Sequence, residues 1–318
     1  MDLRACKICG NTSDNKIFVA KEMMFGLKDE FEYLECAACG CLQIVNIPAN
    51  ITRYYPDNYY SYQSKGEEHF IRRSLAKSLK RAVKKRTLDF YLKGSGLIGQ
   101  ALTSKFKSYY PWLKKGMVGS DSRILDVGCG SGELLLRMYN DGFTNLAGVD
   151  PYIKEEINYA CGITIHKKNL EDVKDKYQLV MMHHAFEHMD EPLHVLKGIN
   201  RLLLPGGNLI IRIPVAGSYA WRKYGVNWVQ LDAPRHFFLH TRKSIQLLSE
   251  GSGFRLKDVQ YDSYDLQFAG SEKYLMGLSL VDPKDPFTEE QKLNFKMEAE
   301  KLNIAGEGDA ACFYLEKI

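Results

Sequence analysis

Two pairs of closely spaced cysteines stand near the start of the chain, Cys6 with Cys9 and Cys36 with Cys39. Each pair encloses two residues and is followed by a glycine, which permits the tight turn that aims both sulfurs to one side. Four thiolates so arranged suit a single tetrahedral Zn²⁺, and the alternative is four buried free thiols. Because four cysteines leave no open coordination position, the expected zinc is structural, and Cys41 is expected to lie outside the ligand set.

A glycine-rich stretch, Leu125–Gly132, lies between an apolar run that predicts a strand and a predicted helix. Its glycines let the backbone turn sharply and approach a ligand, and the helix N-terminus offers unpaired N–H groups. The spacing is GxGxG, whereas dinucleotide-binding enzymes use GxGxxG. Asp126, two residues before the first glycine, suits the ammonium group of a methionine moiety and would repel a pyrophosphate. Asp150 ends the next strand, 22 residues after Gly128, where it can accept hydrogen bonds from ribose hydroxyls.

Two further polar groups follow predicted strands, where ligands bind in a doubly wound sheet. The first consists of His183, His184, Glu187 and His188, and the second is centred on His236. A histidine near either strand end is a candidate general base for a hydroxyl nucleophile. For the first group, packing against a cofactor, orientation of another histidine and a divalent metal site with Asp190 are all open alternatives.

An aromatic group lies between them and predicts either a lid that packs against sugar C–H surfaces or simply core: Tyr219, Trp221, Tyr224 and Trp228. Arg235, beside His236, is a candidate for binding a phosphate or carboxylate of a substrate.

Three regions would position these residues. Residues 1–64 form the zinc-binding module and an aromatic linker, residues 65–120 are expected to be basic helices, and residues 121–318 alternate strands and helices. Strands are expected at 123–127, 146–149, 178–182, 208–213, 254–261 and 310–316, with a helix through 193–203 that Pro205-Gly206-Gly207 ends. This alternation predicts an α/β fold with a mostly parallel, doubly wound sheet.

The segment from Lys65 to Lys115 contains fourteen Lys or Arg against three acidic residues. Phe70, Ile71, Leu75, Leu79 and Val83 recur at helical spacing with basic residues between them. The basic face is either simply solvated or meets phosphates of anionic lipids or of a phosphorylated substrate.

Overall composition is that of a globular protein, with 45% hydrophobic and 26% charged residues and a net charge of +4. No run of about 18 apolar residues occurs, so no membrane-spanning helix is expected. The N-terminus lacks the apolar core of a secretory signal, which points to the cytoplasm, with peripheral membrane contact as an option through the basic region.

The chain from Arg123 to about Phe254 resembles the class I S-adenosylmethionine-dependent methyltransferases. In detail it is similar to a bacterial subgroup with an N-terminal zinc module that is associated with sugar or polysaccharide modification. The resemblance rests on the cysteine pairs, Leu125–Gly132, Asp150, and the stretches 169–172, 175–188 and 204–207. It implies a seven-stranded, Rossmann-like sheet whose last strand, at 309–318, runs antiparallel.

The resemblance also implies roles for individual residues. S-adenosylmethionine would be held by Asp126, Gly128, Cys129, Gly130, Gly132, Asp150, Pro151, Asn169, Leu170 and His183. Many members have Asp where this chain has Asn169. His236 would be the general base, with His184, Glu187 and His188 as further catalytic candidates. Sugar C-methylating members have Tyr and Glu at the positions of Ala233 and Arg235, so their absence favours O-methylation.

The sequence therefore predicts an enzyme that O-methylates a sugar hydroxyl on a nucleotide sugar, a lipid-linked saccharide or a glycan. One alternative is a methyltransferase for nucleic acid, disfavoured because an Asn/Asp-Pro-Pro-Tyr tetrapeptide and a Pro-Cys nucleophile are absent. Another small acceptor, such as a quinone or polyketide, is a second alternative. The third is a cofactor-binding protein without turnover whose zinc module docks a partner.

Overall fold

The computed structural model describes residues 5–56, 75–93 and 110–318, which form two sheets. The larger sheet has eight strands in the order β11-β12-β9-β8-β4-β5-β7-β6. Its parallel centre consists of β4 (Arg123–Val127), β5 (Asn145–Val149), β7 (Thr164–His166), β8 (Tyr177–His183) and β9 (Leu203–Pro214). At one edge β12 (Ala310–Lys317) runs antiparallel between β9 and β11 (Phe254–Tyr261). This confirms the α/β fold and its antiparallel last strand, and the two-residue β6 (Ile157–Asn158) adds an eighth strand.

Helices cover both faces of the large sheet, and each face has its own apolar core. On one face α2 (Leu75–Lys93), α4 (Tyr110–Lys115) and α5 (Glu133–Asp141) contribute Leu88, Leu113 and Leu135. On the other, α6 (Pro192–Leu202) and α8 (Arg242–Glu250) contribute Leu196 and Ile245. Because helices bury both faces, the central strands are apolar nearly throughout, which is why their positions could be predicted within one residue at β4 and β5.

The helix predicted through 193–203 extends one residue beyond the observed end of α6, and Pro205-Gly206-Gly207 is not the signal that ends it. The helix ends at Leu202, and Leu203 already has extended backbone angles. Pro205-Gly206-Gly207 therefore lies within β9, where the pairing register with β8 shifts between Tyr177 and Leu179. The proline and glycines mark an irregularity in the strand and not the end of a helix. The extra residues in β9 need a positive φ, here +70° at Gly206, and a helix end often needs the same conformation.

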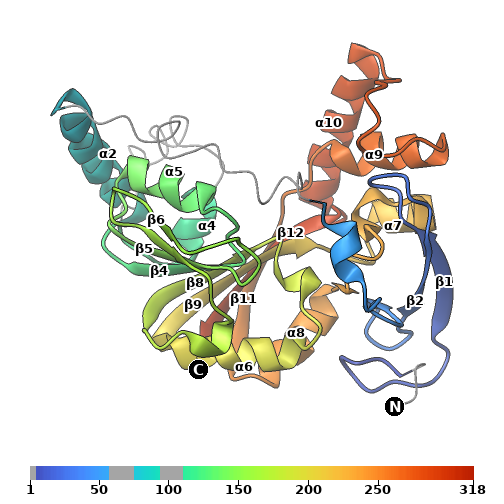
Figure 1. Cartoon of the computed structure of the whole chain (residues 1–318), viewed down its shortest axis with the longest axis horizontal. Coiled ribbons are helices and arrows are strands. Elements are labelled where there is room, and N and C mark those ends of the chain that lie inside the picture. The colour runs from blue at the N-terminus through green and yellow to red at the C-terminus, as the bar shows by residue number, and fades with distance from the viewer. Residues whose placement is uncertain (1–4, 57–74, 94–109) are drawn as a thin grey trace.

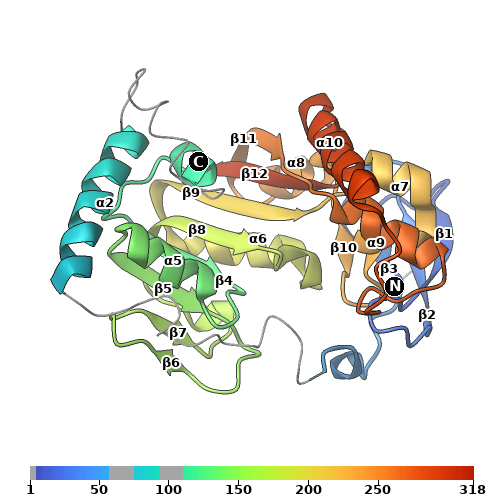
Figure 2. The ribbon, with the colours of Figure 1, turned by 90° about the horizontal axis from the view of Figure 1, so that it is seen from above.

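The smaller sheet is antiparallel and has the order β1-β2-β3-β10. Three strands come from the N-terminal region: β1 (Lys16–Lys21), β2 (Glu30–Glu35) and β3 (Leu42–Ile44). The fourth, β10 (Phe238–Leu239), comes from the C-terminal region and pairs with β3. Figures 1 and 2 show these N-terminal strands beside α7 (Tyr219–Tyr224) and α9 (Leu266–Leu275), with α10 (Glu289–Ala305) next to them.

The aromatic group is core and not a lid. Trp221, Tyr224 and Trp228 are buried in the third apolar cluster, between the small sheet and α9, and Tyr219 packs at its margin. Trp221 Nε1 donates to Glu35 of β2, and Trp228 Nε1 donates to Asp309. These side chains join the two sheets and are unavailable to a saccharide.

The basic helix α2 packs against the half of the chain that contains the large sheet, and some of the residues that were expected to face phosphates make this contact. Arg81 donates to the carbonyls of Tyr139 and Phe143 next to α5, and Lys84 and Lys85 pair with acids of the same half. Val83, which the pattern assigned to the apolar face, is 62% exposed. Phe70, Ile71 and the basic residues before α2 lie outside the described residues.

Within the described ranges, no helix combines the length and the apolar character needed to cross a membrane.

Candidate functional site

The glycine-rich loop after β4 has the backbone that its sequence requires. Gly128, Gly130 and Gly132 have φ of +73°, +54° and +77°, a region that favours glycine. A Cβ on Gly128 would lie 2.6 Å from Cβ of Ala185, and one on Gly132 would lie 2.5 Å from Cδ1 of Ile165. The loop therefore lies directly against the segment that follows β8 and against strand β7. Helix α5 begins at Glu133, immediately after the loop.

Asp126 and Asp150, at the ends of β4 and β5, are both buried beside this loop. Asp150 Oδ2 accepts from N of Gly130 at 2.9 Å, and Oδ1 accepts from N of Tyr152. Burial, and then the charge of Asp150, raise the pKa of Asp126 to about 8. Two carboxylates in this setting suit a ligand that carries hydroxyl donors and a positive charge.

The other predicted cofactor residues are placed less uniformly. Pro151 directly follows Asp150 and is half-buried, and Asn169 is exposed at the start of the 3-10 helix η3 (Leu170–Asp172). Leu170 packs against the core, next to Gly198 of α6. Cys129 is half-buried and directs Sγ toward Gly148 of β5, so its side chain packs between the loop and the sheet.

His183 and His184 end β8 beside Arg212 of β9. The ring of His183 lies 4.8 Å from that of Trp112, and the guanidinium group of Arg212 lies over the Trp112 ring in a cation–π contact. Burial, reinforced by Arg212, lowers the pKa of His183 to about 3, so this imidazole is neutral. His184 has φ of +52°, an uncommon conformation for a non-glycine residue, and its Nε2 accepts from Arg212.

Glu187, His188 and His236 come together at the carboxyl end of β8. One ligand atom of each lies within 4.8 Å of the others. Glu187 and His236 are buried and His188 is half-buried. Burial raises the pKa of Glu187, but His184, His188 and His236 more than offset this and lower it to about 2, so the carboxylate is ionised.

The sequence did not indicate the residues that pack around this cluster and hold it in place. Arg235 is fully buried and pairs with Glu22 at 2.8 Å and with Asp232 at 2.6 Å, so it has an internal role and does not face a substrate. Glu22 lies 213 residues away in the chain, and no local pattern marks it as a partner. Tyr55, beside His188, and Trp112 were likewise without a signal of their own.

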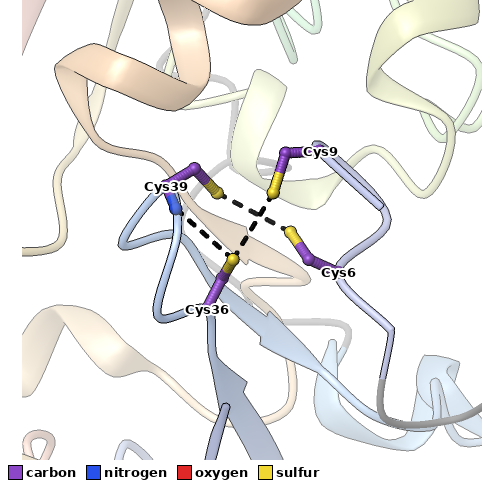
Figure 3. A group of neighbouring side chains, drawn as sticks. All are labelled: Cys6, Cys9, Cys36 and Cys39. Carbon is purple, nitrogen blue, oxygen red and sulfur yellow. Dashed lines mark hydrogen bonds between the residues drawn. The ribbon is translucent and has the colours of Figure 1, made fainter. Parts of the chain in front are cut away.

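The four cysteines converge as their spacing predicts (Figure 3). Cys6 Sγ lies 3.6 Å from Cys39 Sγ, and Cys9 Sγ lies 3.5 Å from Cys36 Sγ. A tetrahedral Zn²⁺ with bonds of about 2.3 Å would set its sulfurs about 3.8 Å apart, so the donor set fits this ion. Cys41 is buried close by but directs its thiol to the carbonyl of Leu42, outside the set.

The cysteine module contacts the segment that carries His236. Tyr33 OH of β2 donates to the carbonyl of His236 at 2.8 Å. Thr241 Oγ1 and Lys243 Nζ, at the start of α8, donate to the carbonyls of Cys39 and Ala38. Folding of the module is therefore expected to hold the His236 segment in place.

Comparison with known proteins identifies the family of this chain. Residues 68–259, more than half of the chain, match the family model described as a methyltransferase domain. A tRNA U34 carboxymethyltransferase of Sulfurimonas denitrificans is 26% identical over 36% of this chain and 43% of that protein. The chain thus spans less than half of the length of that relative.

Two further similarities have wider coverage. A ubiquinone biosynthesis O-methyltransferase of Pseudomonas savastanoi is 26% identical over 46% of this chain and 71% of that protein. Among solved structures, the cyclopropane synthase MmaA2 of Mycobacterium tuberculosis aligns over 72% of this chain and 88% of that one, with 17% identity and a TM-score of 0.44.

Proposed function

The chain belongs to the methyltransferase-domain family and is an S-adenosylmethionine-dependent methyltransferase, and on this premise we propose that it methylates a hydroxyl oxygen of a saccharide. The saccharide is carried on a nucleotide, a lipid or a glycan. The observation that supports a hydroxyl acceptor is the buried cluster of Glu187, His188 and His236 beside the cofactor loop. Oxygen nucleophiles need activation, and this cluster is a concentration of proton- or cation-binding groups where the acceptor must lie.

In this proposal the glycine loop and the two acids hold the cofactor. The sulfonium supplies an activated methyl group, so the chain mainly aligns the acceptor oxygen in line with the S–C bond and excludes water. Asp150 orients the ribose, Asp126 faces the ammonium group, and His236 helps to activate the acceptor hydroxyl. The zinc of the four cysteines has no open position and takes no part in the chemistry.

Transfer of label into the acceptor tests the substrate class. Wild type and His236→Ala are incubated with methyl-labelled S-adenosylmethionine and fractionated extract of the source organism. We expect label in the nucleotide-sugar or glycolipid fraction, with at least about a hundredfold less in the variant, the size usual for loss of a group that activates the nucleophile. His194→Ala, an exposed histidine of α6, serves as the control.

The outcome separates the alternatives. Label in RNA or in a quinone fraction contradicts the saccharide proposal and leaves the methyltransferase assignment intact. Equal labelling by wild type and His236→Ala removes His236 from the acceptor site. Absence of label in every fraction, with cofactor binding shown separately, supports the protein without turnover.

Cofactor affinity is expected to depend on pH through Asp126. Its carboxyl has a pKa raised to about 8 and is therefore mostly protonated at neutral pH, whereas a bound ammonium group needs it ionised. Binding below pH 8 must release that proton, so affinity should rise about tenfold per pH unit between pH 6 and 7.5, where the ligand's own amino group is still charged. Calorimetric titration with S-adenosylhomocysteine measures this slope, and Asp126→Asn should flatten it. A flat profile in wild type would contradict the pairing.

A further inference from the structure

The three side chains at the end of β8 present only hydrogen-bond acceptors to one another. His188 Nδ1 lies 2.8 Å from the carbonyl oxygen of Arg235, and His236 Nδ1 lies 2.7 Å from that of Gln230. A carbonyl can only accept, so each Nδ1 atom carries a proton, and the lone pair with which either ring can bind a metal ion is the one on Nε2. Tyr55 OH is also 3.3 Å from His188 Nδ1, on the same side of that ring.

Glu187 supplies the third acceptor and is not satisfied by hydrogen bonds. Its side chain is 0% exposed, and within the described part of the chain neither carboxylate oxygen has a hydrogen-bond partner. His184 Nδ1 lies 3.4 Å from Oε1 without forming a hydrogen bond, and Asp232 Oδ2, another acceptor, lies 3.8 Å from His236 Nε2. A buried carboxylate without a hydrogen bond is costly, and the approach of His184 to Oε1 leaves Oε2 with no donor, a place that a bound cation would fill.

The surrounding charges do not balance without such a cation. Arg235 is shared by Glu22 and Asp232, which leaves that buried network with one negative charge. Glu187 adds a second, because Arg212, on the far side of His184, is paired with Asp262. Counted over these carboxylates and guanidinium groups alone, the region has a formal charge of −2, which a divalent ion would neutralise.

We infer that Glu187, His188 Nε2 and His236 Nε2 bind a divalent transition-metal ion, a second metal site distinct from the four cysteines. Two imidazoles and one carboxylate are a ligand set that leaves coordination positions open. The backbone carbonyls that accept from the two Nδ1–H groups are the outer partners that metal-bound histidines usually have. Bonds of about 2.1 Å set ligand atoms about 3.0–3.4 Å apart. One candidate ligand atom of each of the three residues already lies within 4.8 Å of the others, so rotations of the side chains would complete the site.

This inference rests on the proposed function for its chemical role. An acceptor hydroxyl bound at an open position becomes more acidic and loses its proton to water. Its oxygen lone pair then forms the new O–C bond while the S–C bond breaks, and the electron pair of that bond remains on sulfur as the neutral thioether. His236 thereby acts as a metal ligand, in place of the general base that its position in the sequence suggested.

Metal binding is tested without any acceptor. Full-length protein with its cysteine site filled by zinc is titrated with Mn²⁺ and followed by electron paramagnetic resonance, since thiolate sites select zinc over manganese. We expect one Mn²⁺ per chain in wild type and in the control His194→Ala. In Glu187→Gln and His188→Gln the affinity should fall by about 10–100-fold, the range for loss of well-placed metal-site partners. Elemental analysis after zinc saturation should count two zinc ions per chain in wild type and one in each variant.

Two results would overturn the inference: a single metal per chain in wild type by both measurements, or undiminished binding in folded Glu187→Gln or His188→Gln. Circular dichroism and retained cysteine-bound zinc establish that a variant is folded. Because two different ligands are substituted, the test still stands if one variant does not fold. The metal titration uses no acceptor, so it is independent of the labelling assay. A protein that binds the second metal but labels no saccharide would contradict the proposed function alone. Labelling by a protein without the second metal would contradict this inference alone.

Discussion

Gly128→Ala is expected to weaken binding of S-adenosylhomocysteine by more than about tenfold, which corresponds to about 1.4 kcal/mol. The new Cβ would lie 2.6 Å from Cβ of Ala185, and alanine has no side-chain torsion that could relieve the overlap. The backbone of the loop or of the segment after β8 must therefore move. Either shift displaces groups that face the cofactor, and calorimetric titration measures the loss.

Gly206→Ala is the matched control for this experiment. Its φ of +70° is close to the +73° of Gly128, so both variants incur the same conformational cost of about 1–2 kcal/mol. A Cβ on Gly206, however, would have nothing within 4 Å. We expect both variants to melt at a lower temperature than wild type but only Gly128→Ala to lose affinity. Equal affinities would show that the contact with Ala185 does not shape the cofactor site.

The parts of the fold that could be predicted are those set by local pattern. Apolar runs located β4 and β5, because buried parallel strands need them, and the spacing of glycines and acids located the loop between them. The two cysteine pairs predicted their own convergence for a similar reason, since four thiolates have few alternatives to a shared ion. In each case the physical requirement is met within a few residues of the motif.

What could not be predicted depends on partners distant in the chain. Arg235 and the aromatic residues of α7 have the composition of a substrate site, and nothing near them indicates Glu22 or Glu35 as partners. Likewise, β10 reads as part of the C-terminal region, yet it completes the sheet of the cysteine module. Whether an arginine or tryptophan faces a ligand or a buried acid is decided by tertiary packing, which local periodicity does not encode.

Cys36→Ser is expected to abolish zinc binding and to unfold the cysteine module. Cys36 is buried, its Sγ lies 3.5 Å from Cys9 Sγ, and it also accepts from N of Cys39. Binding of a structural zinc ion contributes about 10–16 kcal/mol of free energy to the folding of small modules. The apolar core around the four cysteines is too small to supply the same stability without the ion. Elemental analysis should find the cysteine-bound zinc lost, and limited proteolysis should cleave residues 5–44 first.

Cys41→Ser separates loss of a ligand from loss of a buried cysteine. Cys41 is as buried as Cys36 but lies outside the four-sulfur set, so this variant should retain its zinc and lose only a modest amount of stability. Zinc loss in Cys41→Ser, or zinc retained in Cys36→Ser, would contradict the assigned ligands.

The same pair of variants tests why the module is fused to a methyltransferase. In Cys36→Ser the hydrogen bond from Tyr33 to the carbonyl of His236 and those from α8 to the second cysteine turn are lost. The glycine loop belongs to the other sheet and makes none of these contacts. Methyl transfer should therefore fall by at least about tenfold while S-adenosylhomocysteine binds as in wild type, which calorimetry and the labelling assay measure side by side. Parallel loss of both would mean that the module stabilises the whole chain and does not specifically position the His236 segment.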